Sequence, residues 1–153
     1  MNDVAYERAR DDVLVSTDRA RLDVDLVHAA LGSTYWAANI PRDVIVRSIE
    51  NSIAFGVYEG GRQVGFARVV TDLATYGYLT DVFIGEEFRG RGLGDWLVES
   101  IVLHPQLQNL RRLALFTRDA ASLYARHGFA PLEGPSGYME ILNRGVYDAR
   151  PAE

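Results

Sequence analysis

Three glycines and two arginines fall within six consecutive residues, 89–94, in the stretch EEFRGRGLGDWL. Glycine lacks a Cβ atom, so the backbone there can turn sharply and approach a ligand closely. Successive N–H groups of such a loop can converge on one anion, and the positive end of a following helix dipole adds to the attraction. Arginine supplies charge-assisted hydrogen bonds to phosphate oxygens. The stretch therefore predicts a site for a phosphate or a pyrophosphate.

The spacing of these glycines excludes two well-known nucleotide loops. A P-loop needs G-x-x-x-x-G-K-[ST], and no lysine is present here. A dinucleotide-binding loop needs G-x-G-x-x-G, whereas this sequence has G-x-G-x-G. Two alternatives stay open at this point, which are a nucleotide-binding domain of another kind and a flexible turn that ends in a glycine helix cap.

Composition and charge exclude several other classes of protein. The chain of 153 residues has no cysteine, and its three histidines lack the spacing of a zinc site, so we expect no metal. A net charge of −5 disfavours a nucleic-acid partner. No apolar run is long enough to span a membrane, and the polar N-terminus is not a secretory signal. We therefore expect no membrane association and a cytoplasmic location.

The hydrophobic pattern predicts an α/β fold with a mixed sheet and helices on both of its faces. The expected order is β-α-α-β-β-β-α-β-α-β-β, in one domain over residues 1–153 with a loosely ordered segment at 1–12. Glu59-Gly60-Gly61 predicts the turn of a hairpin, and Gly77 is a candidate for a bulge in the following strand. An apolar helix follows the glycine stretch. FAPLEG (129–134) and YMEILN (138–143) are expected as the last two strands.

Three segments together resemble one protein family. Residues 89–94 match the motif [QR]-x-x-G-x-[GA], YLTDVFIGEEFRGRGLGDWL resembles a strand-loop-helix core, and LYARHGF resembles the segment LYEKLGF downstream of it. These features resemble the GNAT superfamily of acetyl-CoA-dependent N-acetyltransferases. The resemblance extends to the order of elements and covers nearly the whole chain, least securely before residue 50.

The resemblance implies that acetyl-CoA is the co-substrate. Loop amides and side chains would hold its pyrophosphate, from Arg89, Gly90, Arg91, Gly92, Leu93 and Gly94. Backbone groups of Val82, Phe83 and Ile84 would pair with the pantetheine arm like an added strand, and an N–H near Val82 or Phe83 would polarise the thioester carbonyl. Thr117 stands where relatives often carry an asparagine that contacts pantetheine, and its hydroxyl can replace only one of the amide's hydrogen bonds.

The same resemblance assigns two catalytic residues. Many relatives carry Glu-Asp before the apolar triplet of the strand, whereas this chain has Thr80-Asp81. Asp81 is the candidate to accept the proton of the amine, directly or through water, and the alternative is a carboxylate that pairs with an arginine or caps a loop. Tyr124 is the candidate general acid for the leaving thiolate, since a phenol is protonated at neutral pH. The alternative is that Tyr124 only packs in the core, as part of the buried face of a helix.

The acceptor site is expected between the first two helices and the central strands, with Tyr35, Trp36, Tyr78 and Thr80 as candidates. An aromatic pocket beside a carboxylate suits a cation, so a small amine or an amino-acid-like acceptor is favoured. A lysine side chain or a protein N-terminus is the alternative acceptor. A non-catalytic acyl-CoA sensor is the alternative function. The resemblance also allows a homodimer, because dimers are common in such enzymes.

Overall fold

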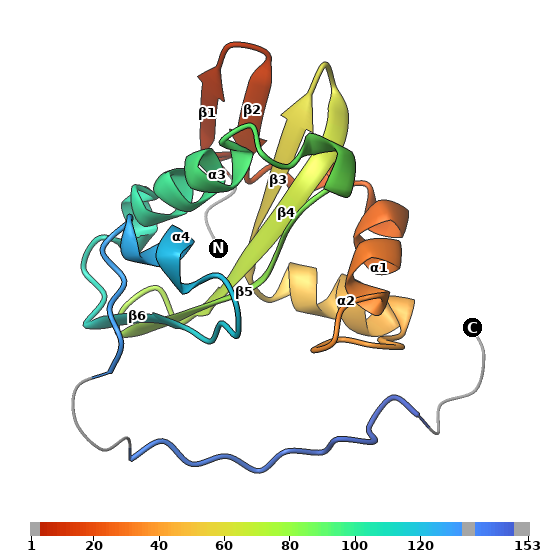
Figure 1. The fold of residues 1–153 in the computed structure, drawn as a ribbon, viewed down its shortest axis with the longest axis vertical. Helices are drawn as coiled ribbons and strands as arrows, with labels where there is room; N and C mark the ends of the chain where they lie inside the picture. The colour runs from red at the N-terminus through yellow and green to blue at the C-terminus, as the bar shows by residue number, and fades with distance from the viewer. Residues whose placement is uncertain (1–3, 133–136, 149–153) are drawn as a thin grey trace.

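The computed structural model describes residues 4–132 and 137–148, which build a mixed sheet between two layers of helices (Figure 1). Within these residues the sheet has six strands in the order β1-β2-β3-β4-β5-β6. All neighbours are antiparallel except β5 and β6, which are parallel. The strands are β1 (Glu7–Arg10), β2 (Val13–Ser16), β3 (Ile53–Glu59), β4 (Arg62–Thr71), β5 (Tyr76–Ile84) and β6 (Arg112–Leu115).

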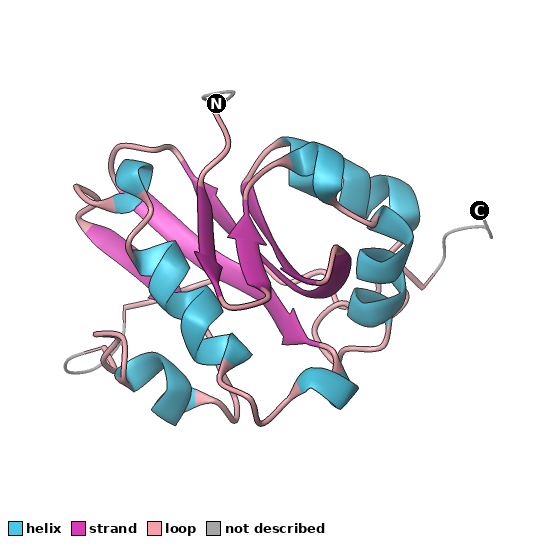
Figure 2. Cartoon of the chain, turned by 90° about the horizontal axis from the view of Figure 1, so that it is seen from above, coloured by secondary structure: helices cyan, strands magenta, loops and turns pink. Residues whose placement is uncertain are grey.

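Helices cover both faces of this sheet, as the view from above shows (Figure 2). The helices α1 (Val24–Gly32) and α2 (Arg42–Glu50) pack on one face, and α3 (Leu93–Val102) and α4 (Ala121–Ala125) pack on the other. Short 3₁₀ turns lie at Arg19–Arg21, Glu86–Phe88 and Pro105–Leu107. The expected fold class, a mixed sheet with helices on both faces, is confirmed.

Local sequence explains the central hairpin and the start of the first helix. Gly60 and Gly61 adopt backbone φ angles of 58° and 80°, which residues with a Cβ atom rarely adopt. These two glycines close the predicted turn between β3 and β4. The side chain of Asp23 accepts a hydrogen bond from the Leu26 N–H at 3.1 Å and caps α1. These short-range signals are enough to fix where both elements begin.

Two hydrophobic cores hold the helices against the sheet. On the α3 side, Leu97, Val98 and Ile101 are fully buried against β-strand residues such as Phe55. Each such side chain contributes about 1.5–3 kcal/mol through removal of apolar surface from water. The second core joins α1 and α2 to the other face, and its buried members are Val27, Leu31, Ala37, Ile40, Ile45, Ile49, Ala54 and Phe66.

The structure differs from several expectations about the strands and the N-terminal segment. The segment expected to be loosely ordered contains β1, which forms because its backbone pairs with β2, although its side chains are largely exposed. Residues 138–143 form no strand, and Met139 and Ile141 are 91% and 104% exposed. Residues 133–134 of the other expected strand lie outside the described residues, and 129–132 form no strand. The bulge of β5 lies at Asp81 rather than at Gly77.

Tyr58 of β3 buries a hydroxyl group that has no hydrogen-bond partner in the described part of the chain. Its ring lies over Gly56, where a Cβ atom would collide with it. Burial raises the pKa of Tyr58 to about 12, with smaller raising contributions from Asp18 and Glu7 and a lowering one from Arg21. The folded state therefore disfavours ionisation of this phenol.

We expect Tyr58→Phe to leave the free energy of unfolding unchanged or to raise it by about 1 kcal/mol, because an unsatisfied buried hydroxyl costs stability. A raised folded-state pKa gives stability that is present below the unfolded pKa of about 10 and is lost as the pH rises towards about 12. The variant should lose less stability than the wild type over this range. Urea denaturation at neutral and alkaline pH measures both effects, with the exposed Tyr76→Phe as control. A clear loss of stability at neutral pH would show that the hydroxyl has a partner.

Candidate active site

The site begins where the two parallel strands of the sheet separate. β5 pairs with β6 only from Tyr76 opposite Arg112 to Leu79 opposite Leu115. β5 continues to Ile84 and stays paired with β4 on its other edge, where Ile84 lies opposite Gly65. Residues 80–84 therefore present an edge of β5 to which β6 contributes no hydrogen bond. An extended ligand can add to this edge as a strand would.

A bulge at Asp81 changes the course of β5 at this point. Thr80 lies opposite Arg68 and Phe83 opposite Phe66, so β5 has one residue more than β4 in this interval. Asp81 has a φ of 57°, a left-handed conformation that aspartate tolerates better than most residues do. The extra residue leaves Val82 and Phe83 at the separated edge, where the predicted pantetheine contacts lie.

The carboxylate of Asp81 is buried and bound by two donors. Its Oδ2 accepts a hydrogen bond from Arg68 Nε at 2.6 Å, and its Oδ1 accepts one from Trp36 Nε1 at 2.9 Å. The side chain of Asp81 is 6% exposed and that of Arg68 is 18% exposed. This arrangement matches the alternative role predicted for Asp81, a carboxylate paired with an arginine. It also joins the bulge to the loop between α1 and α2.

The glycine stretch forms the turn that the sequence predicts between β5 and α3. Gly90 and Gly92 have φ angles of 77° and 79°, and Gly92 is the residue before the first turn of α3, which no side chain caps. A Cβ atom at Gly90 would meet no atom within 4 Å, so packing of the chain does not demand glycine there. The backbone conformation demands it, and the open space lets an anion approach the free N–H groups.

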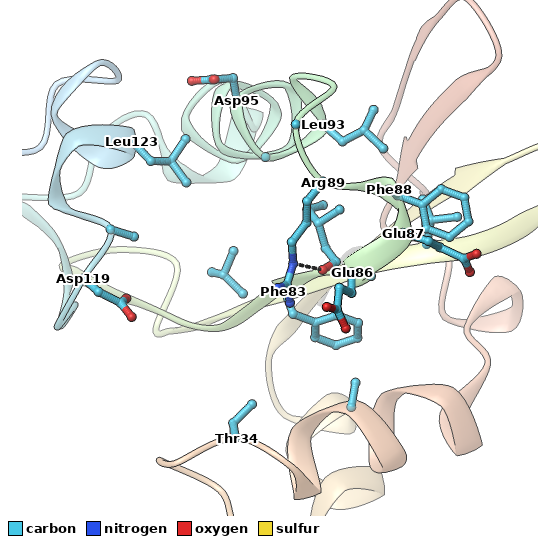
Figure 3. Close-up of a pocket in the computed structure, with 18 of the residues that line it drawn as sticks. Thr34, Phe83, Glu86, Glu87, Phe88, Arg89, Leu93, Asp95, Asp119 and Leu123 are labelled. Atoms are coloured by element: carbon cyan, nitrogen blue, oxygen red, sulfur yellow. Dashed lines mark hydrogen bonds between the residues drawn. The ribbon is translucent and has the colours of Figure 1, made fainter.

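The two arginines of the stretch point in different directions. Arg89 Nε donates a hydrogen bond to the Ile84 carbonyl oxygen at 2.9 Å. Figure 3 draws this bond as a dashed line between the labels of Arg89 and Phe83. Arg91 Nη2 instead forms an ion pair with Glu59 at 2.7 Å. Arg89 lines a cleft that begins at the glycine turn, and Arg91 does not line it. The predicted binding role of Arg91 therefore has no support from its position.

A cleft of about 1100 Å³ connects the glycine turn, the free edge of β5 and the loop between α1 and α2. The predicted site residues that line it are Tyr35, Trp36, Val82, Phe83, Ile84, Arg89, Gly90, Gly92, Leu93, Gly94 and Tyr124. Those that do not line it are Tyr78, Thr80, Asp81, Arg91 and Thr117. The fold thus collects most of the predicted site residues around one cavity, although they come from distant parts of the chain.

Tyr124 of α4 reaches the cleft from the α3 side. Its ring packs edge-on against Phe129 at 5.9 Å, and the residue is largely buried in the α3-side core. Burial raises the pKa of Tyr124, and the nearby Asp119 and Tyr35 raise it further. The phenol is therefore protonated at neutral pH, as a proton donor must be. It has no hydrogen-bond partner among the described residues, so its hydroxyl is available to a ligand.

The aromatic pair on the opposite wall is Tyr35 and Trp36, whose rings meet edge-on at 4.9 Å. Both come from the loop after α1, as predicted. Tyr78 and Thr80 lie on β5 before the bulge and outside the cleft lining. Sequence reasoning placed them with the acceptor as residues of a central strand, but the bulge at Asp81 lies between them and the part of β5 that lines the cleft.

The turn between β6 and α4 contributes two cleft residues that sequence reasoning missed, Arg118 and Asp119. Their neighbour Thr117 was predicted to contact the cofactor, but its hydroxyl accepts a hydrogen bond from the Ala120 N–H at 3.0 Å and starts the turn before α4. A signal was available, because Arg118 and Asp119 lie in sequence between two predicted site residues, Thr117 and Tyr124. The identity of the side chains alone did not show which of them faces the cleft.

Comparison with known proteins now decides the family. A family model described as an acetyltransferase (GNAT) domain matches residues 50–131, which include the whole of β5, the glycine turn, α3 and Tyr124. The chain belongs to the GNAT family of acetyltransferases. Among its relatives is a Gibberella zeae protein, named only provisionally as an acetyltransferase, which is 38% identical over 77% of this chain and 78% of its own.

Solved structures agree with this assignment. A provisionally named acetyltransferase of the GNAT family from Xanthomonas campestris pv. campestris is 47% identical, with a TM-score of 0.85 over 89% of this chain and 96% of that chain. A Clostridium acetobutylicum protein, described as a predicted acetyltransferase and solved with acetyl-CoA, has a TM-score of 0.60 over 91% of this chain and 96% of its own. At 14% identity it shows the fold alone.

The GNAT family uses acetyl-CoA, and the residues of this cleft fit such a molecule. The uncapped N-terminus of α3 and the Arg89 side chain suit a pyrophosphate, while the free edge of β5 suits an amide-bearing arm. Within residues 4–132 and 137–148, no group of three or more metal-ligating side chains is found. No helix in the described part of the chain is long and apolar enough to cross a membrane.

We expect Gly94→Glu to raise the Kd for CoA at least tenfold without loss of stability. Gly94 lies in the first turn of α3 and lines the cleft, so a carboxylate there suits the helix dipole but repels a pyrophosphate. Gly94→Ala is the matched control and should change the Kd by no more than a few fold. Isothermal titration calorimetry gives the affinities and thermal denaturation gives the stability. Equal CoA affinity in both variants would place the pyrophosphate elsewhere.

We expect Asp81→Asn to lower the free energy of unfolding by about 2 kcal/mol or more, because it leaves the mostly buried Arg68 without its counter-ion. Asparagine tolerates the left-handed backbone of residue 81 and keeps one acceptor for Trp36. The double variant Arg68→Gln/Asp81→Asn removes both charges and should recover most of the loss. Chemical denaturation of the three proteins tests this. Unchanged stability of the single variant would contradict a structural role for the ion pair.

Proposed function

We propose that this protein transfers the acetyl group of acetyl-CoA directly to a primary amine of a small acceptor, in a complex that holds donor and acceptor together. The observation that carries the proposal is that the glycine turn, the free edge of β5 and Tyr124 line one cleft. Acetyl-CoA, when bound, supplies a thioester whose C–S bond breaks as the amine nitrogen forms a bond to the acetyl carbon.

The residues of the chain have distinct tasks in this proposal. The amides at the start of α3 and the Arg89 side chain bind the pyrophosphate, and the edge of β5 at residues 82–84 aligns the arm that carries the acetyl group. An N–H group near Val82 or Phe83 donates a hydrogen bond to the thioester oxygen, where negative charge develops. Alignment and charge stabilisation together lower the barrier to attack.

Two protons must also move. Tyr124 donates its phenolic proton to the leaving thiolate, and its raised pKa keeps that proton in place at neutral pH. The proton of the amine leaves through water. Asp81 serves as a positioning residue, since its oxygens already accept hydrogen bonds from Arg68 and Trp36. Through Trp36, which lines the cleft, this carboxylate fixes the wall against which the acceptor rests.

The experiment is incubation with acetyl-CoA and a panel of primary amines, with detection of the free thiol that is released. The chain contains no lysine, so acetylation of its own lysine side chains cannot produce a false signal. Turnover of small amines supports the proposal. Binding of CoA without thiol release on any amine favours the sensor function, and turnover of peptides alone favours a protein acetyltransferase.

We expect Tyr124→Phe to lower kcat by about a hundredfold or more while the Kd for CoA changes by less than a few fold, because only the proton donor is lost. Steady-state kinetics and calorimetry on the same preparation separate the two quantities. Tyr78→Phe is the matched control, since Tyr78 lies outside the cleft and should retain full activity. An unchanged kcat for Tyr124→Phe would refute the role of general acid.

A further inference from the structure

Arg118 holds an unusual position in the cleft. It lies in the turn between β6 and α4, and its guanidinium carbon lies 3.8 Å from the centre of the Tyr35 ring on the opposite wall. The contact joins the β6–α4 turn to the α1–α2 loop across the separated strands. Stacking of a guanidinium on an aromatic ring is favourable and holds the planar group in a defined orientation.

The other arginines that line the cleft have polar partners. Arg62 pairs with Glu87 at 3.0 Å, Arg89 donates to the Ile84 carbonyl oxygen, and Arg126 pairs with Asp95 at 3.1 Å. In the described part of the chain, Arg118 makes neither an ion pair nor a hydrogen bond. A stacked guanidinium keeps its N–H donors in the plane of the group, so they remain free to bind a carboxylate in two parallel hydrogen bonds.

The location of Arg118 points to the acceptor rather than to the pyrophosphate. Its stacking partner Tyr35 and its neighbour Asp119 both lie close enough to Tyr124 to raise the pKa of that phenol. The glycine turn lies at the start of α3, whereas Arg118 lies before α4 and stacks on the loop after α1. Arg118 is therefore near the group that performs the chemistry.

The geometry points to an acceptor that carries a carboxylate as well as its amine, an amino acid, with Arg118 as the residue that binds the carboxylate. This inference rests on the proposed function and deepens it. Asp119 stands beside Arg118 and offers a negative charge to the ammonium group of such a molecule.

The test compares matched acceptors on the wild-type protein and on Arg118 variants. Each amino acid is paired with its carboxamide, which keeps the amine and the side chain but removes the negative charge, and O-phosphoethanolamine is included as a phosphorylated amine. We expect the wild type to show kcat/KM at least tenfold higher for the carboxylate than for the carboxamide. Arg118→Ala should reduce kcat/KM on carboxylates by about tenfold to a hundredfold, mainly through KM, and should leave the carboxamides almost unchanged.

Further variants separate binding of the carboxylate from other roles. Arg118→Lys keeps the charge but loses the planar fork, so it should recover only part of the preference. The Kd for CoA should be the same in Arg118→Ala and the wild type, and a rise of tenfold in that Kd would show that Arg118 binds the donor instead.

The outcomes distinguish this inference from the function on which it rests. Thiol release from carboxylates and carboxamides at equal rates overturns the inference and leaves the acetyltransferase function standing. A preference for the phosphorylated amine also overturns it. Thiol release from no amine at all, with CoA binding intact, overturns the proposed function and the inference with it.

Discussion

The arrangement of this molecule depends on the ion pair between Arg68 and Asp81. It fixes a residue with a left-handed backbone inside a β-strand, at the point where β5 separates from β6. A left-handed conformation is unfavourable for most residues, and here a short charge-assisted hydrogen bond and a second one from Trp36 offset that cost. The free edge of β5 that follows the bulge is the surface along which the rest of the cleft is built.

The same ion pair connects the two halves of the site. Trp36 belongs to the loop after α1 and lines the wall that we propose for the acceptor, while Val82 and Phe83 follow the bulge and line the side that we propose for the donor. A change at Asp81 would therefore move both walls, even though this carboxylate does not line the cleft. This explains how a residue expected to act as a base from its place in the family motif can matter through position instead.

Charge in the cleft is arranged so that most cations are neutralised before a ligand arrives. Arg62 and Arg126 pair with carboxylates, and such exposed pairs contribute little to stability. Their effect is on the electrostatic potential, because they leave the free amides of α3, the Arg89 side chain and Arg118 as the groups that attract anions. These groups suit the phosphate-bearing donor and the carboxylate-bearing acceptor that we propose.

The sequence by itself determined the fold class, the β3–β4 hairpin and the glycine turn, and it singled out Tyr124, which the structure places at the cleft. Glycine conformation, helix periodicity and short motifs are local properties, so they can be recognised along the chain without knowledge of its path. It could not determine that β1 pairs with β2, that residues 138–143 stay unpaired within the described chain, or that the bulge lies at Asp81. Strand pairing depends on partners that are distant in sequence.

Only the tertiary structure decided the partners of the charges, since Arg91 pairs with Glu59, Asp81 with Arg68 and Trp36, and Arg118 stacks on Tyr35. Such contacts form across elements tens of residues apart, and the sheet and its two helical layers must be assembled before they exist.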